Sequence, residues 1–386
     1  MVDGIKDARE ERQQRLRYAL DTIGNEAIDL DALKKKIAGS KTSWLVAELF
    51  DGLASRYPAK PLPTEFTVMA TDGSHIDVDR HRSTRCYLIN IGSAVIHYGA
   101  SPTASLDSSP TLYSGDEDLV IMPSAGDKGR EQFVEGTLLG IKRAVEECRR
   151  LTVLARELPP AGNGLALLDG SLMLWGLEGF PDFVNEALLI KGFLSCLDEL
   201  KSLNNDKKLA LASYISFPRS TDVVNVLRLA ICPYESANCE NYCPPGKPGA
   251  CEAVAGVRDR DLFHNLLGEG ERSALFGTSS KIVKKHYGVH NIYFFYLRVD
   301  DEVARVEVPQ WVAQDEGLLN LVHSLVLDQC RRGQGYPVTL SESHELAVVT
   351  GADREKFWQM VETSLTAEHL PTGGSAKSMS KRTRWV

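Results

Sequence analysis

The sequence predicts an α/β protein, because short apolar runs typical of β-strands alternate with long amphipathic helices. Two of these runs, at residues 66–72 and 165–169, lead into the same tripeptide, Asp-Gly-Ser, which begins at Asp72 and at Asp169. A buried strand that stops at a carboxylate delivers it to the carboxyl edge of the sheet, where α/β proteins place their chemistry. We therefore expect a sheet with two aspartates at one edge, and these suggest a divalent-metal site.

The composition is that of an ordinary soluble globular protein, with 386 residues, 43% hydrophobic and 25% charged. No run approaches the roughly 18 to 20 apolar residues that a membrane span needs. The first residues lack the basic-then-apolar order of a secretory signal, so we expect a cytoplasmic protein with no membrane partner. The net charge of −8 argues against a surface that coats nucleic acid throughout, but it is compatible with a local basic groove.

The N-terminal segment, residues 1–60, is predicted to be helical. Apolar residues recur there at steps of three and four up to about residue 57, which is typical of amphipathic helices packed on the main body or on a second subunit. Pro58, Pro61 and Pro63 then interrupt the pattern and lead into the first strand.

The next segment has the alternation of β-strands. Runs at residues 67–70, 86–91, 94–98 and 118–122 predict a meander of three or more neighbouring strands. A long helix is expected over about residues 129–157, because an apolar stripe recurs at helical spacing.

A crossover pattern follows the meander. The strand that ends at Asp169 precedes a helix at 183–203 and a strand at 209–215. The order of three strands, helix, strand, helix and strand is the ribonuclease H-like arrangement, whose mixed sheet fits the change from meander to crossover. Further strands are expected at 292–299 and 304–308.

The C-terminal part is predicted to contain helices at about 318–331 and 341–349. Residues 370–386 are rich in Gly, Ser, Lys and Arg and are predicted to form a disordered basic tail. Arg305 and Glu307 share one face of their strand, and we expect a buried ion pair that supports the site without taking part in catalysis.

The two aspartates suit phosphodiester hydrolysis, which needs an activated water and a counter-charge for the developing negative oxygens. Two divalent ions about 3.5–4 Å apart supply both. Mg²⁺ and Mn²⁺ prefer carboxylate oxygens, so acids from separate elements should converge at one sheet edge. The alternative is that each Asp-Gly-Ser is only a turn that ends a strand.

A third carboxylate is expected on the helix at 129–157. Glu146 and Glu147 compete for this role. Glu147 lies at the border of the apolar stripe, whereas Glu146 shares the outer face with basic residues, so we favour Glu147. An ordinary solvated helix residue remains the alternative for Glu147.

A cysteine-rich insert at residues 232–251 has the spacing C-x6-C-x3-C-x7-C, formed by Cys232, Cys239, Cys243 and Cys251. Four thiolates on a turn-rich loop suit a structural zinc ion or an iron–sulfur cluster. The spacing lacks the C-x2-C knuckle of zinc ribbons, so it does not determine which metal would bind. The alternative is four reduced cysteines without a ligand.

Four segments in the C-terminal half carry a family resemblance: Ser-Ser-Lys at 279–281, the strand at 291–297, Ala-Arg-Val-Glu-Val-Pro at 304–309, and residues 335–344, which run from Gly-Tyr-Pro to Glu-Ser-His. In this order, after the two Asp-Gly-Ser strands, they resemble the NurA family of DNA-repair nucleases over roughly residues 65–365. We therefore expect a NurA-like nuclease domain at 61–369.

The resemblance implies a ribonuclease H-like core with manganese-dependent (or magnesium-dependent) 5′–3′ exonuclease or endonuclease activity on DNA. It also implies a toroidal homodimer and a HerA-type hexameric ATPase that feeds single- or double-stranded DNA ends to the nuclease. The expected role is the processing of double-strand breaks.

The resemblance also implies roles for six residues. Metal ligands would be Asp72, Asp169, Glu147 and His344, with Lys281 meeting a phosphate and Tyr336 matching the C-terminal tyrosine of the family. His344 would complete the metal sphere or act on the leaving group. An imidazole is an acceptable Mn²⁺ ligand, and a lysine is a point counter-charge for a phosphate. Without the resemblance, His344 could equally be a surface histidine, Lys281 a solvated lysine and Tyr336 a tyrosine that supports a turn.

Two other functions remain open on the same fold. One is a catalytically silent subunit that binds DNA ends or acts as an ATPase adaptor. The other is a ribonuclease or a nuclease of mobile-element defence, because a fold alone does not determine the substrate.

Overall fold

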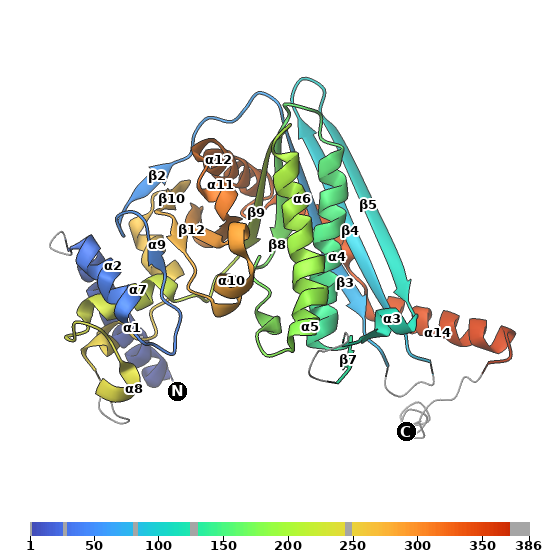
Figure 1. Ribbon diagram of the computed structural model, residues 1–386. Helices are drawn as coiled ribbons and strands as arrows, with labels where there is room; N and C mark the ends of the chain where they lie inside the picture. Colours follow the sequence, from blue (N-terminus) through green and yellow to red (C-terminus); the bar gives the residue numbers. More distant parts are fainter. Residues whose placement is uncertain (1, 26–28, 80–83, 124–129, 244–248, 371–386) are drawn as a thin grey trace. The chain divides into compact units, whose positions relative to one another are not determined.

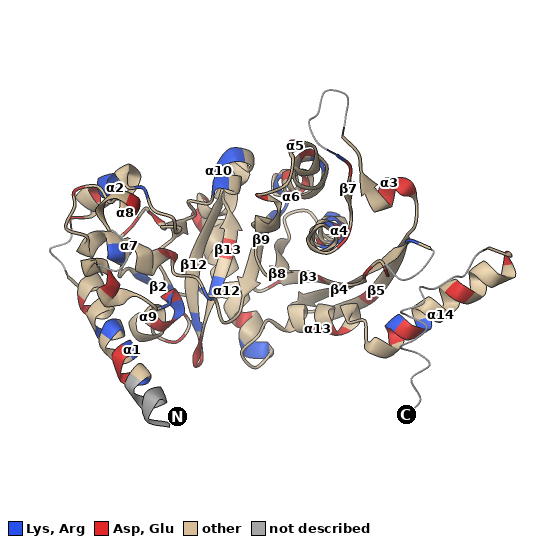
Figure 2. Ribbon diagram, turned by 90° about the horizontal axis from the view of Figure 1, so that it is seen from below, with Lys and Arg blue, Asp and Glu red and all other residues tan. Residues whose placement is uncertain are grey.

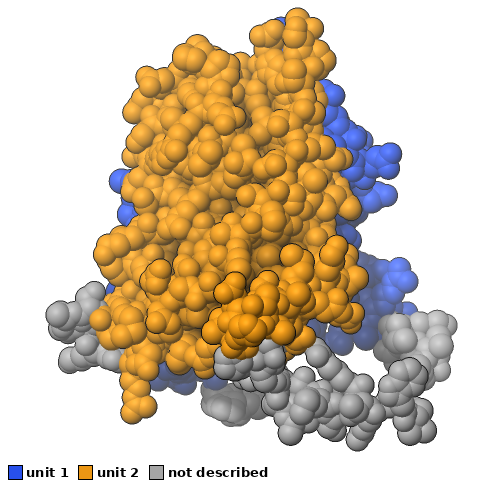
Figure 3. All heavy atoms as spheres, turned by 90° about the vertical axis from the view of Figure 1, so that its right-hand side faces the viewer, with its two compact units in different colours: residues 1–64, 169–173, 208–338 blue, residues 65–168, 174–207, 339–386 orange. Residues whose placement is uncertain are grey.

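The computed structural model describes residues 2–25, 29–79, 84–123, 130–243 and 249–370. The chain divides into two compact units (Figure 3). Unit 1 comprises Met1–Thr64, Asp169–Met173 and Lys208–Val338, and unit 2 comprises Glu65–Leu168, Leu174–Lys207 and Thr339–Val386. Both units combine strands and helices, which confirms the α/β class. The predicted tail lies outside the described residues from position 371 onward.

Unit 2 contains a mixed sheet in the order β8-β3-β4-β5. Its strands are β3 (Phe66–Ile76), β4 (Tyr87–Tyr98), β5 (Thr103–Tyr113) and β8 (Asn163–Asp169). The pairs β3–β4 and β4–β5 are antiparallel, whereas β3 and β8 are parallel, in a register that ends at Thr71 and Leu168. A meander is therefore present as predicted, although its strand bounds differ from the prediction, and the crossover to β8 makes the sheet mixed.

Helices cover both faces of this sheet (Figure 2). On one face, α4 (Thr137–Arg156) lies beside α6 (Ser195–Leu203), which continues α5 (Asp182–Val184) and the π-helix η2 (Asn185–Leu194) (Figure 1). The other face carries α13 (Val338–Ala347). The remaining elements are α3 (Asp116–Leu119), β6 (Val120–Ile121), β7 (Gln132–Phe133), η1 (Trp175–Leu177) and α14 (Gly351–Ala367).

Unit 1 contains an antiparallel sheet in the order β1-β11-β12-β13-β9, and β10 pairs with both β12 and β2. The strands are β1 (Glu48–Leu49), β2 (Arg56–Pro58), β9 (Lys208–Ile215), β10 (Glu271–Ser273), β11 (Phe276–Gly277), β12 (Ile292–Val299) and β13 (Glu302–Pro309). Its helices are α1 (Val2–Ile23), α2 (Leu30–Gly39), α7 (Asp222–Ile231), α8 (Cys239–Tyr242), η3 (Ala250–Val254), α9 (Asp259–Leu266), α10 (Lys281–His286), η4 (Gly288–His290), α11 (Gln310–Ala313) and α12 (Glu316–Arg332).

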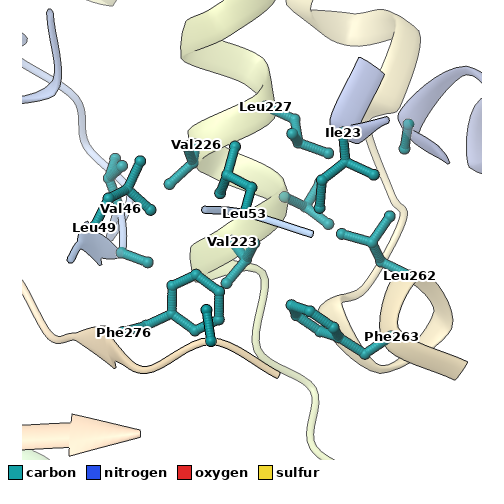
Figure 4. Close-up of a cluster of buried hydrophobic side chains, with 14 of the residues drawn as sticks. Ile23, Val46, Leu49, Leu53, Val223, Val226, Leu227, Leu262, Phe263 and Phe276 are labelled. Atoms are coloured by element: carbon teal, nitrogen blue, oxygen red, sulfur yellow. The ribbon is translucent and has the colours of Figure 1, made fainter. Parts of the chain in front are cut away.

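The core of unit 1 forms around α7 (Figure 4). Val223, Val226 and Leu227 of this helix pack among buried side chains that include Ile23 of α1 and Phe263 of α9. The burial of Ile23 shows that the N-terminal helices pack on the body of the chain, as one of the two predicted alternatives requires.

The helical prediction is wrong for residues 40–57. The apolar residues there have helical spacing, yet the segment forms an irregular stretch with the short strands β1 and β2. β1 pairs with β11, and β2 pairs with β10. Pairing with strands more than 200 residues away in the sequence overrides the local pattern, which is a weak guide when tertiary contacts compete.

Two strand predictions need correction. The runs at 86–91 and 94–98 form one strand, β4, because Gly92 and Ser93 continue the pairing with β3. The third strand of the meander is β5, at 103–113, whereas residues 118–122 begin in the short helix α3. The sequence of β5 lacks the apolar–polar alternation from which strands are predicted, and its residues are exposed along nearly the whole strand.

The position of Asp72 also differs from the prediction. β3 continues through Asp72, Gly73 and Ser74 to Ile76, so Asp72 lies within the strand and not at its end. By contrast, β8 ends at Asp169, as predicted. Among the described residues, no helix combines the length and the apolar character that crossing a membrane requires.

Candidate active site

Asp72 on β3 lies next to His344 on α13 in unit 2. The Oδ2 atom of Asp72 is 2.6 Å from Nδ1 of His344. The aspartate side chain is 14% exposed and the histidine side chain is 61% exposed. The other carboxylate oxygen, Oδ1, accepts the backbone N–H of Gly73 at 2.8 Å. A largely buried carboxylate and an exposed imidazole therefore meet at the surface of unit 2.

Gly92 allows α13 to approach the sheet closely enough for this contact. It is the partner of Asp72 in the β3–β4 register. A β-carbon at Gly92 would overlap the carbonyl oxygen of Ser343 and would lie 2.5 Å from the backbone nitrogen of Ala347. Nearby, the side-chain amide of Asn90 donates to the carbonyl of Ala347 at 3.0 Å. Because Gly92 has no side chain, α13, which carries His344, packs directly against β4 next to Asp72.

Gly92→Ala is expected to displace α13 and to separate His344 from Asp72. Because the obstructing atoms are backbone atoms, they do not rotate away, and overpacking of this kind costs about 1–3 kcal/mol. The free energy of unfolding, measured by urea denaturation, should fall by that amount.

The matched control for this prediction is Gly140→Ala within α4, where a β-carbon would meet nothing within 4 Å. It should stabilise the protein by about 0.5–1 kcal/mol, because alanine favours the helix interior. Equal stability of the two variants would contradict the close approach of α13.

Glu147 approaches β3 from the opposite face. Its side chain is buried on α4, and its Oε1 atom pairs with Nε of Arg143 at 3.0 Å. A β-carbon on Gly73 would lie 2.5 Å from the same Oε1 atom. Successive residues of a strand point to opposite faces, so the Asp72 carboxylate faces α13 while Glu147 lies against Gly73. The glycine leaves room for the glutamate to reach the strand beside Asp72.

Glu146 has a different environment. Its carboxylate pairs with Lys142 at 2.7 Å and with Arg149 at 2.8 Å, all on α4. The two neighbouring glutamates therefore separate as the periodicity predicted, with Glu146 in a network of basic residues and Glu147 against the sheet.

Asp169 and Tyr336 form a second pair, in unit 1. The Tyr336 hydroxyl donates to Oδ1 of Asp169 at 3.0 Å. Gly170 has a positive φ of 81°, and its N–H donates to the carbonyl of Tyr214 at 3.0 Å. The ring of Tyr336 packs edge-on against Tyr214, with centroids 5.5 Å apart. Tyr336 thus positions the Asp169 carboxylate through its hydroxyl and supports the loop through its ring.

A buried ion network holds the loop that follows Asp169. The Oε2 atom of Glu307 accepts the Ser171 hydroxyl at 2.8 Å and the Leu172 N–H at 3.0 Å. Its Oε1 atom pairs with Nε of Arg305 at 2.9 Å, and Arg305 also pairs with Asp222 at 3.0 Å. The predicted Arg305–Glu307 pair is confirmed, but sequence reasoning missed its contact with the Asp-Gly-Ser loop.

The charge of Arg305 is maintained although the side chain is buried. Burial alone would lower the pKa of Arg305, but the neighbouring carboxylates of Glu307 and Asp222 raise it further than burial lowers it. The guanidinium also stacks over the ring of Phe294, 3.6 Å from its centroid. A permanently charged arginine therefore anchors both acids.

Lys281 is exposed at the first position of α10. Directly after this helix, the Tyr287 hydroxyl donates to the carbonyl of Leu172 at 3.0 Å. The helix that carries Lys281 is therefore bonded to the loop that follows Asp169.

The six predicted site residues fall into two groups. Unit 2 contains Asp72, Glu147 and His344, whereas unit 1 contains Asp169, Lys281 and Tyr336. In the described part of the chain, no three His, Cys, Asp or Glu side chains are grouped so that they could hold a metal ion.

The model of the NurA domain matches residues 66–349 of this chain, which is more than half of its length. The match begins at the first residue of β3 and ends two residues after α13, so it includes all six predicted site residues and the cysteine-rich insert. No curated protein matches the chain.

Proposed function

Because this chain belongs to the NurA family, which is associated with nuclease activity and DNA repair, we propose that it is a metal-dependent DNA nuclease. The proposed reaction is hydrolysis of phosphodiester bonds at DNA ends, as a 5′–3′ exonuclease, an endonuclease or both. The observation that carries the proposal is the contact between Asp72 and His344, which brings together two side chains predicted separately from the sequence.

We further propose a ribonuclease H-like core. The strand order β8-β3-β4-β5, with α4 between β5 and β8 in the chain, supports it, because this is the beginning of the predicted order. The parallel register of β3 and β8 ends at Thr71 and Leu168, and each catalytic aspartate is the next residue along its strand.

The donor set suits Mn²⁺ or Mg²⁺. Carboxylate oxygens are the preferred ligands of both ions, and Mn²⁺ also accepts an imidazole nitrogen. Asp72 and His344, which are in contact in unit 2, are the ligands that the geometry supports. Asp169 and Glu147 are ligands that the family resemblance suggests, and the Glu147 carboxylate lies beside Gly73 on the face of β3 opposite the Asp72 carboxylate. When bound, a divalent ion supplies an activated water and neutralises negative charge on the phosphate.

The side chains of the protein would orient the reaction. The Tyr336 hydroxyl fixes one oxygen of Asp169, so the carboxylate keeps a defined direction. The Nδ1 atom of His344 faces Asp72, so Nε2 is the ring nitrogen that remains for a leaving oxygen or for the metal. Lys281 would supply a counter-charge to a phosphate at the start of α10.

The proposed partners are DNA, a second copy of the chain and a HerA-type hexameric ATPase. The NurA family works with HerA-type ATPases and DNA. In this scheme the ATPase feeds DNA ends to the nuclease dimer.

A catalytically silent end-binding or adaptor subunit is the second candidate. It is favoured by one observation, that no three potential ligands form a closed metal site among the described residues. Such a subunit would bind DNA ends and change the ATPase rate of its partner without cutting DNA.

The test of the proposed function uses end-labelled single- and double-stranded DNA with the purified protein in Mn²⁺, Mg²⁺ or EDTA. Cleavage is expected with Mn²⁺ and should disappear in EDTA, because the carboxylates need a cation to activate water. Retention of DNA ends without cleavage under any metal would support the adaptor and overturn the nuclease.

A further inference from the structure

The cysteine-rich insert contains four thiols that the proposed nuclease site does not use. Cys232 follows the last residue of α7, Cys239 begins α8, Cys243 follows α8, and Cys251 lies in η3. All four are half-buried and none forms a disulfide. They are thus partly exposed, and Cys232 packs against the hydrophobic core of unit 1.

The four thiols lie near one another although up to 19 positions separate them in the sequence. A β-carbon on Gly249 would be 3.6 Å from the sulfur of Cys243 and 3.6 Å from the sulfur of Cys251. The thiols of Cys243, Cys251 and Cys232 are electrostatic neighbours of the Cys239 thiol, and the backbone N–H of Cys243 donates to the carbonyl of Cys239 at 3.2 Å. The insert therefore brings its cysteines to one place.

The insert has little else to hold it together. Between residues 232 and 254, only Ala237 and Val254 are buried hydrophobic side chains among the described residues. Hydrogen bonds also attach it to α2 and the segment after α2. For example, Lys41 N–H donates to the carbonyl of Ala237 at 2.7 Å, and Ala237 N–H donates to Ser40 Oγ at 3.0 Å. A segment with so little apolar burial usually needs a disulfide or a metal to stay ordered.

We propose that Cys232, Cys239, Cys243 and Cys251 together bind one structural metal centre, either a zinc ion or an iron–sulfur cluster. Soft thiolate ligands select these metals over Mg²⁺ and Mn²⁺, so the centre is chemically distinct from the nuclease site. Each cysteine releases its proton to solvent when its sulfur binds the metal. Four protein ligands leave no open coordination position for a substrate.

The thiols do not form a closed ligand set among the described residues. Metal binding is coupled to folding, so the binding energy would itself order this segment. The metal would draw the sulfurs of Cys232 and Cys239 to those of Cys243 and Cys251, which both lie close to Gly249.

The position of the centre gives it a structural role in unit 1. Cys232 directly follows α7, and the ammonium of Lys36 on α2 donates to the Cys232 carbonyl at 2.5 Å. At the other end of α7, Asp222 pairs with Arg305, which pairs with Glu307 beside the Asp169 loop. The metal centre would therefore fix α2 and the C-terminal end of the helix whose first turn supports that loop.

The first test measures zinc, iron and acid-labile sulfide in the full-length protein purified without oxygen. We expect about one zinc per chain, or about four irons with four sulfides and a visible absorption band. Cys239→Ser and Cys243→Ser should each lose most of the metal. Cys196→Ser, a buried cysteine of α6 outside the insert, is the matched control and should retain it.

A second measurement uses only the wild-type protein, so it tests the proposal even if the cysteine variants fail to fold. The wild-type protein is alkylated with iodoacetamide before and after treatment with a chelator, and the modified cysteines are identified by mass spectrometry. We expect the four insert cysteines to be protected before chelation and modified after it. Metal below about 0.1 per chain, even after incubation with Zn²⁺ or iron and sulfide, or equal alkylation in both states, would overturn the proposal.

Discussion

Asp72→Asn and Glu147→Gln are each expected to reduce DNA cleavage by about 10²–10³-fold, whereas Glu146→Gln should leave cleavage nearly unchanged. The amide substitutions preserve size but remove the negative oxygen that a divalent cation requires. Glu146 is the matched control, because it is adjacent in the sequence and pairs with Lys142 and Arg149, whereas the Glu147 carboxylate lies against Gly73 of β3. Initial rates of end-labelled DNA cleavage in saturating Mn²⁺ would measure the effect.

The same assay separates the two members of the Asp169 pair. Asp169→Asn should lose as much activity as Asp72→Asn, whereas Tyr336→Phe removes one hydrogen bond and should cost about five- to tenfold. Full activity of both aspartate variants would refute the site. A large loss in Glu146→Gln with none in Glu147→Gln would reverse the assignment of the helix carboxylate.

Glu307→Gln is expected to lower the free energy of unfolding by about 3–5 kcal/mol, because it removes one partner from a buried ion network. The Glu307 side chain is 1% exposed, and its carboxylate bonds to Arg305, Ser171 and Leu172. An amide has one acceptor oxygen in place of two, so the Arg305 contact and the loop contacts cannot both be retained. Chemical denaturation measures the stability, and the cleavage rate of the folded variant should fall as well because the Asp169 loop loosens.

The control for this variant is Glu269→Gln, the same substitution at a residue whose side chain is 63% exposed and 3.7 Å from Arg331. An exposed ion pair contributes about 0–1 kcal/mol, so the free energy of unfolding should change little in Glu269→Gln. If Glu307→Gln were as stable as this control, the buried network would not support the loop.

Several elements with a strong local pattern were predicted correctly, although the helix predicted over 129–157 begins only at Thr137, after the short strand β7. β12 has the predicted bounds, and α12 differs from its prediction by two residues at the start and one at the end. The Arg305–Glu307 pair followed from the two-residue period of a strand, and Asp169 ends β8 as expected. In each case, residues within a few positions of one another determine the result.

Elements whose formation depends on a distant partner were not predicted correctly. Residues 40–57 have helical periodicity, but β1 and β2 pair with strands more than 200 residues later. β5 has no apolar alternation, and it forms because β4 supplies a complete antiparallel partner from Tyr87 to His97. Backbone hydrogen bonding to a neighbouring strand compensates for a weak local preference.

The sequence by itself identified the residue types of the candidate site, including two Asp-Gly-Ser acids, the helix glutamate and the histidine, and it determined the α/β class. Only the tertiary structure decided how they are arranged. Asp72 and His344 are 272 positions apart, and they meet because Gly92 lets α13 lie on the strand. Ser171 and Glu307 are 136 positions apart and meet in a buried network. Periodicity records the face on which a side chain lies, whereas the close packing of particular backbone and side-chain atoms decides which faces meet.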